Sequence, residues 1–108
     1  MQDKKGYEEI IREVVAKWIS KEASSASLIT VTGVSYEKKG NKCFVHITVM
    51  PEEKEKAVLD FLKRNVVELR KHVGSVIKNH KVPFIEVHLD AGEKNRYRII
   101  ELLEQDKD

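Results

Sequence analysis

The chain has few of the residues that mark several other classes of protein. Its 108 residues include one cysteine, two prolines and five glycines. The single cysteine, Cys43, excludes an intramolecular disulfide and therefore a disulfide-stabilised secreted scaffold. The low proline and glycine content, with 41% hydrophobic residues, excludes collagen-like, low-complexity and wholly disordered chains. We expect one folded domain over residues 1–108, with its core between about 7 and 103, in a reducing, cytoplasmic compartment.

Long apolar runs and a strong net charge are also missing. Apolar runs are short, as at Val14 and Val15, so we expect neither a membrane span nor a signal peptide. The net charge of +2 is too small to indicate a nucleic-acid partner by itself. The charge is uneven, however, because six basic side chains and one acidic one lie between Phe61 and Val82. Such a stretch fits a solvated helix face or a surface for an anionic partner.

Hydrophobic periodicity predicts the first half of the fold. Apolar residues at helical spacing over residues 7–19 predict an amphipathic helix. Small residues over 23–27 then end this pattern. β-Branched residues over 28–36, followed by alternating apolar residues over 43–49, predict two strands joined as a β-hairpin.

The second half is predicted to add a helix, a strand and a closing helix. Pro51 suits the first position of a helix that runs to about Lys78, with a bend near Gly74. Alternation over 85–89 predicts the third strand, and residues 97–103 a short helix before an acidic tail. The order α-β-β-α-β-α predicts an α+β two-layer sandwich, in which helices cover one face of a three-stranded sheet.

Strand alternation divides the side chains of this sheet between a core face and an open face. The residues expected to be buried together are Val14, Trp18, Ile47, Phe61, Leu69 and Val87. Cys43 falls on the core face, where a thiol acts as an inert apolar filler. The open face is expected to carry Thr30, Thr32, Phe44, His46, Thr48, Phe84, Glu86 and His88.

The order of elements resembles the type II KH arrangement, and particular segments narrow the resemblance. They are Leu-Ile-Thr-Val-Thr-Gly-Val-Ser at 28–35, the basic helix at 62–73 with its Leu-Arg pair, and Lys-Val-Pro-Phe-Ile-Glu-Val-His-Leu-Asp at 81–90. The segment Arg-Ile-Ile-Glu-Leu-Leu at 98–103 follows them. With this order and spacing over 10–103, the chain resembles a divergent member of the bacterial ribosome-binding factor A family. The resemblance implies a non-enzymatic assembly factor that binds small-subunit rRNA during maturation.

The resemblance further implies a role in 16S rRNA processing and 30S subunit biogenesis. Its implied partners are the small ribosomal subunit and the rRNA of that subunit. We expect a monomer that takes no small-molecule substrate and does not bind a membrane.

One part of the chain departs from the family pattern. The family has an Ala-x-Gly kink between its two central helices, in place of the Gly-x-x-Gly loop of RNA-binding KH domains. Asn65, Val66 and Val67 stand there in this chain, and the glycine is missing. Three outcomes remain open: no kink, a kink formed at Asn65 by other means, or a kink displaced to Gly74.

The basic helix and the segment after it supply the candidate RNA-binding residues. Lysine and arginine side chains along one side of a helix neutralise several phosphates at once. The resemblance favours this role over a merely solvated helix face. The candidates are Lys63, Arg64, Asn65, Arg70, Lys71, Lys78 and Lys81.

The open sheet face supports an alternative function. Exposed aromatic rings stack on bases in RRM sheets, but the chain lacks their Gly-Phe-Val-x-Phe string. The same rings also suit a protein partner, so the alternative is an α+β protein-interaction module that binds no nucleic acid. Four histidines lack metal-ligand spacing, and neither a Ser-His-Asp arrangement nor a glycine-rich phosphate loop is present. We therefore expect no metal, no cofactor and no enzymatic activity.

Overall fold

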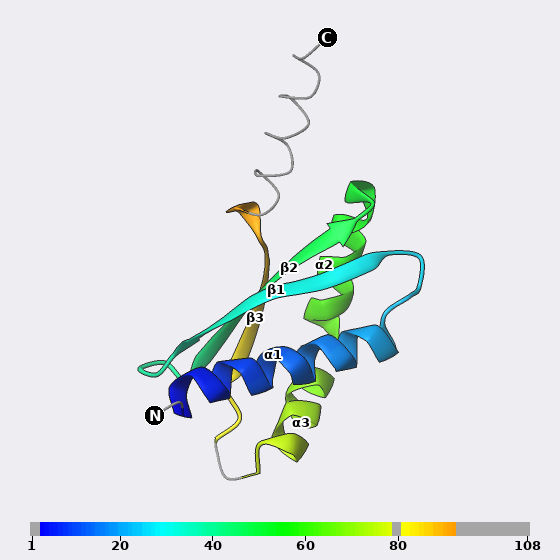
Figure 1. The fold of residues 1–108 in the computed structure, drawn as a ribbon. Coiled ribbons are helices and arrows are strands. Elements are labelled where there is room, and N and C mark those ends of the chain that lie inside the picture. Colours follow the sequence, from blue (N-terminus) through cyan, green and yellow to red (C-terminus); the bar gives the residue numbers. More distant parts are fainter. Residues whose placement is uncertain (1–2, 79–80, 93–108) are drawn as a thin grey trace.

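The computed structural model of the chain describes residues 3–78 and 81–92. Figure 1 shows its elements in chain order, which agrees with the predicted order as far as the third strand. The helix predicted over 97–103 and the acidic tail lie outside the described residues. The elements are α1 (Asp3–Glu22), β1 (Leu28–Glu37), β2 (Lys42–Met50), the 3-10 turn η1 (Glu52–Lys54), α2 (Glu55–Arg64), α3 (Val66–Val76) and β3 (Phe84–Leu89).

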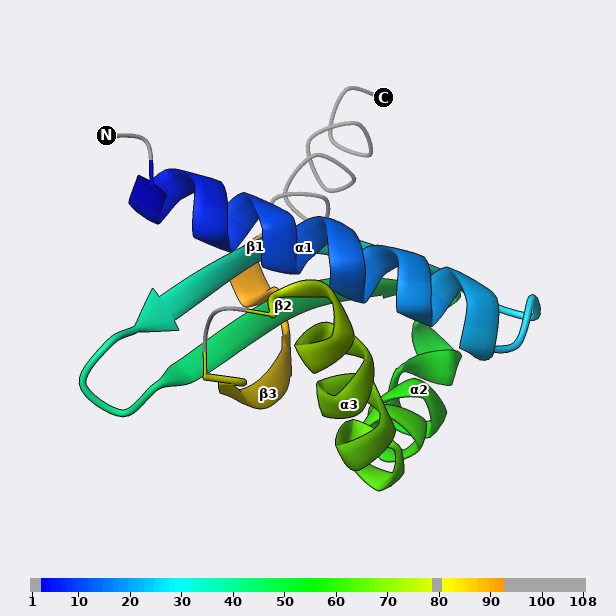
Figure 2. The ribbon, with the colours of Figure 1, turned by 90° about the horizontal axis from the view of Figure 1, so that it is seen from below.

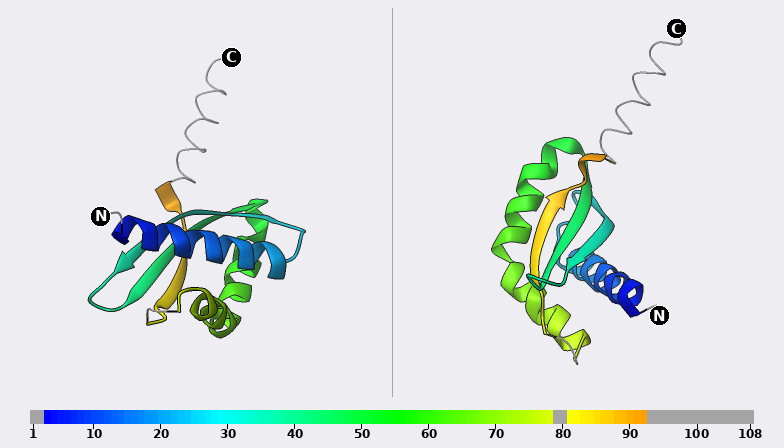
Figure 3. Two further views of the ribbon diagram at one scale, coloured as in Figure 1. Left: turned by 60° about the horizontal axis from the view of Figure 1, so that its bottom comes forward. Right: turned by 90° about the vertical axis from the view of Figure 1, so that its left-hand side faces the viewer.

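The sheet is mixed and has the order β1-β2-β3. β1 and β2 form the predicted antiparallel hairpin, whose turn contains Asn41 at a φ of 51°, a conformation that asparagine tolerates. β3 pairs with β2 in parallel, which requires a long crossover, and α2 with α3 supplies it. Figures 2 and 3 show α1 and the α2–α3 pair packed against the sheet.

The core lies between the helices and the inward side chains of the strands. Every second residue of β2 from Cys43 to Val49 is buried, as the alternation predicts. Burial raises the pKa of the Cys43 thiol to about 11, so the thiol is neutral at physiological pH. Among the predicted core residues, Phe61 and Val87 are partly buried against the core, and the four that are fully part of it are Val14, Trp18, Ile47 and Leu69.

The central helix predicted as one element is divided at Asn65 into α2 and α3, and Gly74 lies within α3. Asn65 has φ −108° and ψ 17°, outside the helical region, and separates α2 from α3. Its side-chain Nδ2 donates a hydrogen bond to the Phe61 carbonyl at 2.8 Å, and its backbone N–H donates to the same oxygen at 3.1 Å. The Phe61 carbonyl in the last turns of α2 therefore accepts two hydrogen bonds from Asn65, and the side-chain bond holds the asparagine against the end of the helix.

Gly74 instead allows a close approach within the regular part of α3. A Cβ atom at this position would lie 2.8 Å from Cγ2 of Val82, closer than side-chain carbons pack. The glycine therefore makes room for the segment that leads into β3. Of the three outcomes left open by the sequence, the structure has the kink at Asn65.

A bulge in β1 joins two of the segments that carried the family resemblance. The pairing of β1 with β2 shifts register between Val31 and Gly33, which leaves Thr32 as the extra residue. Its hydroxyl oxygen lies 2.5 Å from Oδ2 of Asp90 and 3.2 Å from the carbonyl oxygen of His46. Thr32 therefore ties the middle of β1 to the end of β3 across the central strand.

Candidate nucleic-acid interface

Lys63 and Arg64 occupy the last turn of α2, directly before the kink. Both side chains are exposed. Cations in the last turn of a helix interact favourably with the negative end of its dipole. The kink at Asn65 ends the helix here, so both cations project at the junction of α2 and α3 instead of along one continuous helix.

Asn65 itself is half-buried and maintains the kink through its contact with Phe61. The geometry gives this side chain an architectural role between two basic segments. Its direct contact with RNA stays a prediction.

The Arg70 side chain contacts the protein backbone and does not extend into solvent beside the other candidate RNA-binding residues. Its Nε donates to the Pro83 carbonyl at 2.9 Å, and a terminal nitrogen donates to the Val82 carbonyl at 3.1 Å. The guanidinium carbon also lies 4.7 Å from the centre of the Phe84 ring. Arg70 therefore connects α3 to the start of β3, and a planar fork with several donors suits this task.

Lys71, Lys78 and Lys81 are exposed beside and beyond α3. Nζ of Lys71 lies 3.8 Å from a carboxylate oxygen of Glu68, and both side chains are highly exposed, so this ion pair contributes little. Lys78 follows α3, and Lys81 precedes Pro83 at the entry to β3. The Arg70 hydrogen bonds to Val82 and Pro83 hold this entry against α3, which keeps Lys81 near the helix.

A groove of about 410 Å³ separates α2 from β3. Its walls are mostly apolar, and Lys63 lies on its rim. The lining residues are Leu59, Leu62, Lys63, Val66, Ile85, Glu86, Val87, His88 and Leu89.

The backbone of β3 adds polar groups to this groove. Phe84 donates its N–H to the Asn41 carbonyl beside the central strand, and Asp90 donates to the Ile47 carbonyl, so the even-numbered residues pair with β2. The odd-numbered residues then direct their N–H and C=O groups to the outer edge, where no strand of the described chain pairs with them. The groove thus combines apolar walls with hydrogen-bonding groups, a combination that suits an unstacked base.

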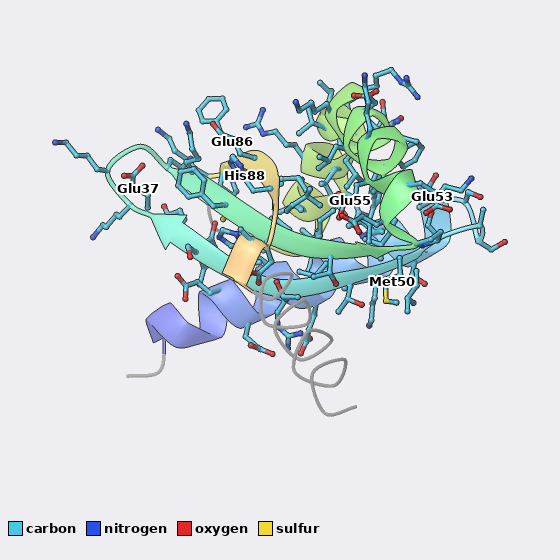
Figure 4. All side chains as sticks on the ribbon, turned by 90° about the horizontal axis from the view of Figure 1, so that it is seen from above. Glu37, Met50, Glu53, Glu55, Glu86 and His88 are labelled. Atoms are coloured by element: carbon cyan, nitrogen blue, oxygen red, sulfur yellow. The ribbon has the colours of Figure 1, made fainter. Side chains whose placement is uncertain are left out.

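The open sheet face carries a cluster of rings and paired charges, of which Glu86 and His88 are labelled in Figure 4. The His88 ring centre lies 6.0 Å from that of Phe44 and 6.4 Å from that of His46. Glu86 lies between Lys42, at 2.9 Å, and Nε2 of His88, at 3.0 Å. The hydrogen bond from Lys42, and then that from His88, lowers the pKa of Glu86 below its ordinary value.

The aromatic residues predicted to share this face are divided between two environments. Phe44 lies within the ring cluster, whereas the ring of Phe84, 56% exposed, contacts the Arg70 guanidinium of α3. The sheet cluster therefore offers one phenylalanine and two histidines for contact with a partner.

Two basic residues of α1 were missed by the sequence reasoning. Lys17 and Lys21 are exposed and lie near Lys71, because α1 packs against α3. Their spacing of four residues indicates a common helix face. That spacing carries no information about which other helix this face meets.

Other kinds of site find little support in the described part of the chain. Residues 3–78 and 81–92 contain no group of three or more side chains able to hold a metal ion. No helix within these residues is long and apolar enough to cross a membrane.

Comparisons with known proteins agree with this fold. The chain is similar to the crystal structure of ribosome-binding factor A from Thermus thermophilus, with a TM-score of 0.68 and 21% sequence identity. The match covers 78% of this chain and 91% of that one. A search of curated proteins finds no match. The family model described as ribosome-binding factor A matches residues 3–103, nearly the whole chain, and on this match the chain belongs to the ribosome-binding factor A family.

Proposed function

We propose that this protein binds the maturing small ribosomal subunit and contacts its 16S rRNA through the basic side chains of α2, α3 and the entry to β3. The family match over residues 3–103 supports the ribosome as partner. The observation that carries RNA contact is the exposure of five cations in this part of the fold. They are Lys63, Arg64, Lys71, Lys78 and Lys81.

These cations are available to an anionic partner. Within the described residues, only Lys71 among the five has a carboxylate within 4 Å, and that pair is weak. Phosphate contacts of this kind position an RNA without reading its sequence. We therefore expect binding that depends strongly on salt and weakly on sequence.

The kink and the groove give the contact its shape. Asn65 separates α2 from α3, so the cations before and after it follow two directions instead of one straight helix. An RNA strand that Lys63 holds by its phosphates lies beside the α2–β3 groove. The apolar walls and the free backbone edge of β3 then suit a base from that strand.

The mode of action that fits this surface is structural. We infer that the protein acts in the cytoplasm as a monomer, without cofactor or catalysis, and promotes maturation of the subunit and processing of its rRNA. Binding energy from several phosphates stabilises one arrangement of the rRNA over others, which requires no reactive side chain.

A protein-interaction module remains the second candidate function. The ring cluster of Phe44, His46 and His88 favours it, because exposed aromatic side chains are enriched at protein interfaces. In this alternative the sheet face binds the partner and the basic helices are merely solvated.

Sedimentation of a cell lysate through a sucrose gradient tests the proposal. We expect the protein to migrate with free small subunits and to leave them in high salt. With purified 16S rRNA transcript and about three to five phosphates neutralised, the log-log salt slope should be about −2 to −5. An affinity that does not change between low and high salt would contradict phosphate binding.

A further inference from the structure

A second basic surface lies in the hollow between α1 and α3. Figure 2 shows α1 running across α3, and the space between their side chains measures about 540 Å³. The hollow is lined by Lys17, Trp18, Lys21 and Glu22 of α1 and by Glu68, Lys71 and His72 of α3.

The charges around this hollow favour an anion. Three lysines oppose two glutamates, and Glu68 is already near Lys71 at 3.8 Å. Lys17 and Lys21 form no ion pair with any other residue in ranges 3–78 and 81–92. They stand one helical turn apart, about 6 Å along the axis, so their like charges repel until an anion lies between them.

The apolar part of the hollow is the Trp18 side chain. Trp18 is 8% exposed and packs into the core, where its ring centre lies 6.3 Å from that of Phe61. A low-dielectric floor strengthens the attraction between a phosphate and the lysines around it. The indole also lies next to any ligand that enters.

We propose that this hollow binds the sugar–phosphate backbone of RNA, as a second contact beyond the α2–α3 surface. The inference rests on the proposed function, because it gives the same rRNA a further site on α1. The cations are spread along one turn of α1 and across to α3, which fits successive phosphates of a chain better than one small anion. Lys71 belongs to both surfaces and makes them continuous.

Lysine footprinting on the wild-type protein tests this site directly. The protein is treated with an amine-acetylating reagent, with and without saturating 16S rRNA transcript, and each lysine is quantified by mass spectrometry. We expect RNA to protect Lys17 and Lys21 at least threefold, whereas Lys38 and Lys39, exposed in the β1–β2 turn, stay reactive.

A charge-reversal pair gives the matched comparison. Lys17→Glu with Lys21→Glu should weaken RNA binding at least tenfold, whereas Lys38→Glu with Lys39→Glu makes the same change of charge and should leave affinity within twofold. Trp18 is the only tryptophan, so its emission should change on RNA binding in the wild type and in the control pair, but not in the K17E/K21E protein. Circular dichroism confirms that each variant is folded.

The outcomes separate this inference from the proposed function. Protection of Lys78 and Lys81 without protection of Lys17 and Lys21 overturns the hollow and leaves the proposed function standing. A protein that shows no RNA-dependent protection at any lysine contradicts both. If inorganic phosphate at millimolar concentration protects Lys17 and Lys21 as fully as RNA does, the hollow is a small-anion site and the proposal is wrong.

Discussion

The helix side and the open sheet side of this protein both carry charges, but they satisfy them differently. On the helix side, Lys63, Lys78 and Lys81 are exposed and have no carboxylate within 4 Å in the described residues. On the sheet side, Lys42 and His88 both contact Glu86. An exposed cation without a partner loses no ion pair when it meets a phosphate. What distinguishes the two surfaces is therefore whether their cations already form ion pairs with carboxylates. The number of cations matters less for RNA binding.

Reversing charges on the helix side should have the largest effect. Replacing Lys71, Lys78 and Lys81 together with glutamate should lower affinity for 16S rRNA by about a hundredfold or more, since each phosphate contact becomes a repulsion. The three side chains are exposed, so the fold should survive. Filter binding and co-sedimentation with small subunits measure the loss.

The matched change on the sheet side is Phe44→Ala with His46→Ala. We expect rRNA affinity to stay within a few-fold, because neither ring belongs to the basic surface. If this variant loses subunit binding while the charge-reversed protein retains it, the sheet is the working surface. A stacking platform would lose about 1–3 kcal/mol for each base contact.

Arg70 tests which basic residues are structural. Arg70→Lys keeps the charge but cannot reproduce two hydrogen bonds to the Val82 and Pro83 carbonyls or the contact with Phe84. The free energy of unfolding should fall by about 1–3 kcal/mol. Urea denaturation measures this, and the salt slope of RNA binding should stay the same. A changed slope with unchanged stability would place Arg70 among the phosphate ligands.

Asn65→Ala tests the kink with a smaller expected effect. Loss of the side-chain hydrogen bond to the Phe61 carbonyl should lower the free energy of unfolding by about 1 kcal/mol. RNA affinity should also fall, because the directions of α2 and α3 are less well defined. Chemical denaturation measures the change in stability, and filter binding measures the change in RNA affinity. A variant of unchanged stability would show that the backbone alone maintains the kink.

The smallest effect is expected from the paired charges of the sheet. The folded-state pKa of Glu86 is lowered from 4.5, chiefly by the hydrogen bond from Lys42, so the pair stabilises the fold above that pH. Its contribution should decrease as the pH falls through the lowered folded-state value, where the carboxylate becomes protonated in both states. The difference in unfolding free energy between the wild type and Lys42→Met should therefore be small at pH 7 and vanish at low pH. A difference that persists in strong acid would assign the effect of Lys42 to packing.

The sequence by itself determined the order of the elements through β3, apart from the division of the central helix, and the core face of the sheet. The reason is that these depend on local periodicity: every second residue of β2 is buried, and the stripe that includes Val14 and Trp18 faces the core. The basic stretch before β3 was equally visible, since a count of charges needs no coordinates.

Only the tertiary structure decided how that basic stretch is arranged. Helix propensity indicated a bend at Gly74, but the break occurs at Asn65, whose side chain and backbone both donate to the Phe61 carbonyl, and Gly74 instead accommodates Val82. Arg70 points inward because β3 brings two carbonyls within its reach. The hollow beside Lys17 exists because α1 packs on α3. The roles of Gly74 and Arg70, and the hollow, depend on contacts between different elements of the chain, and such contacts leave no periodic pattern in the sequence.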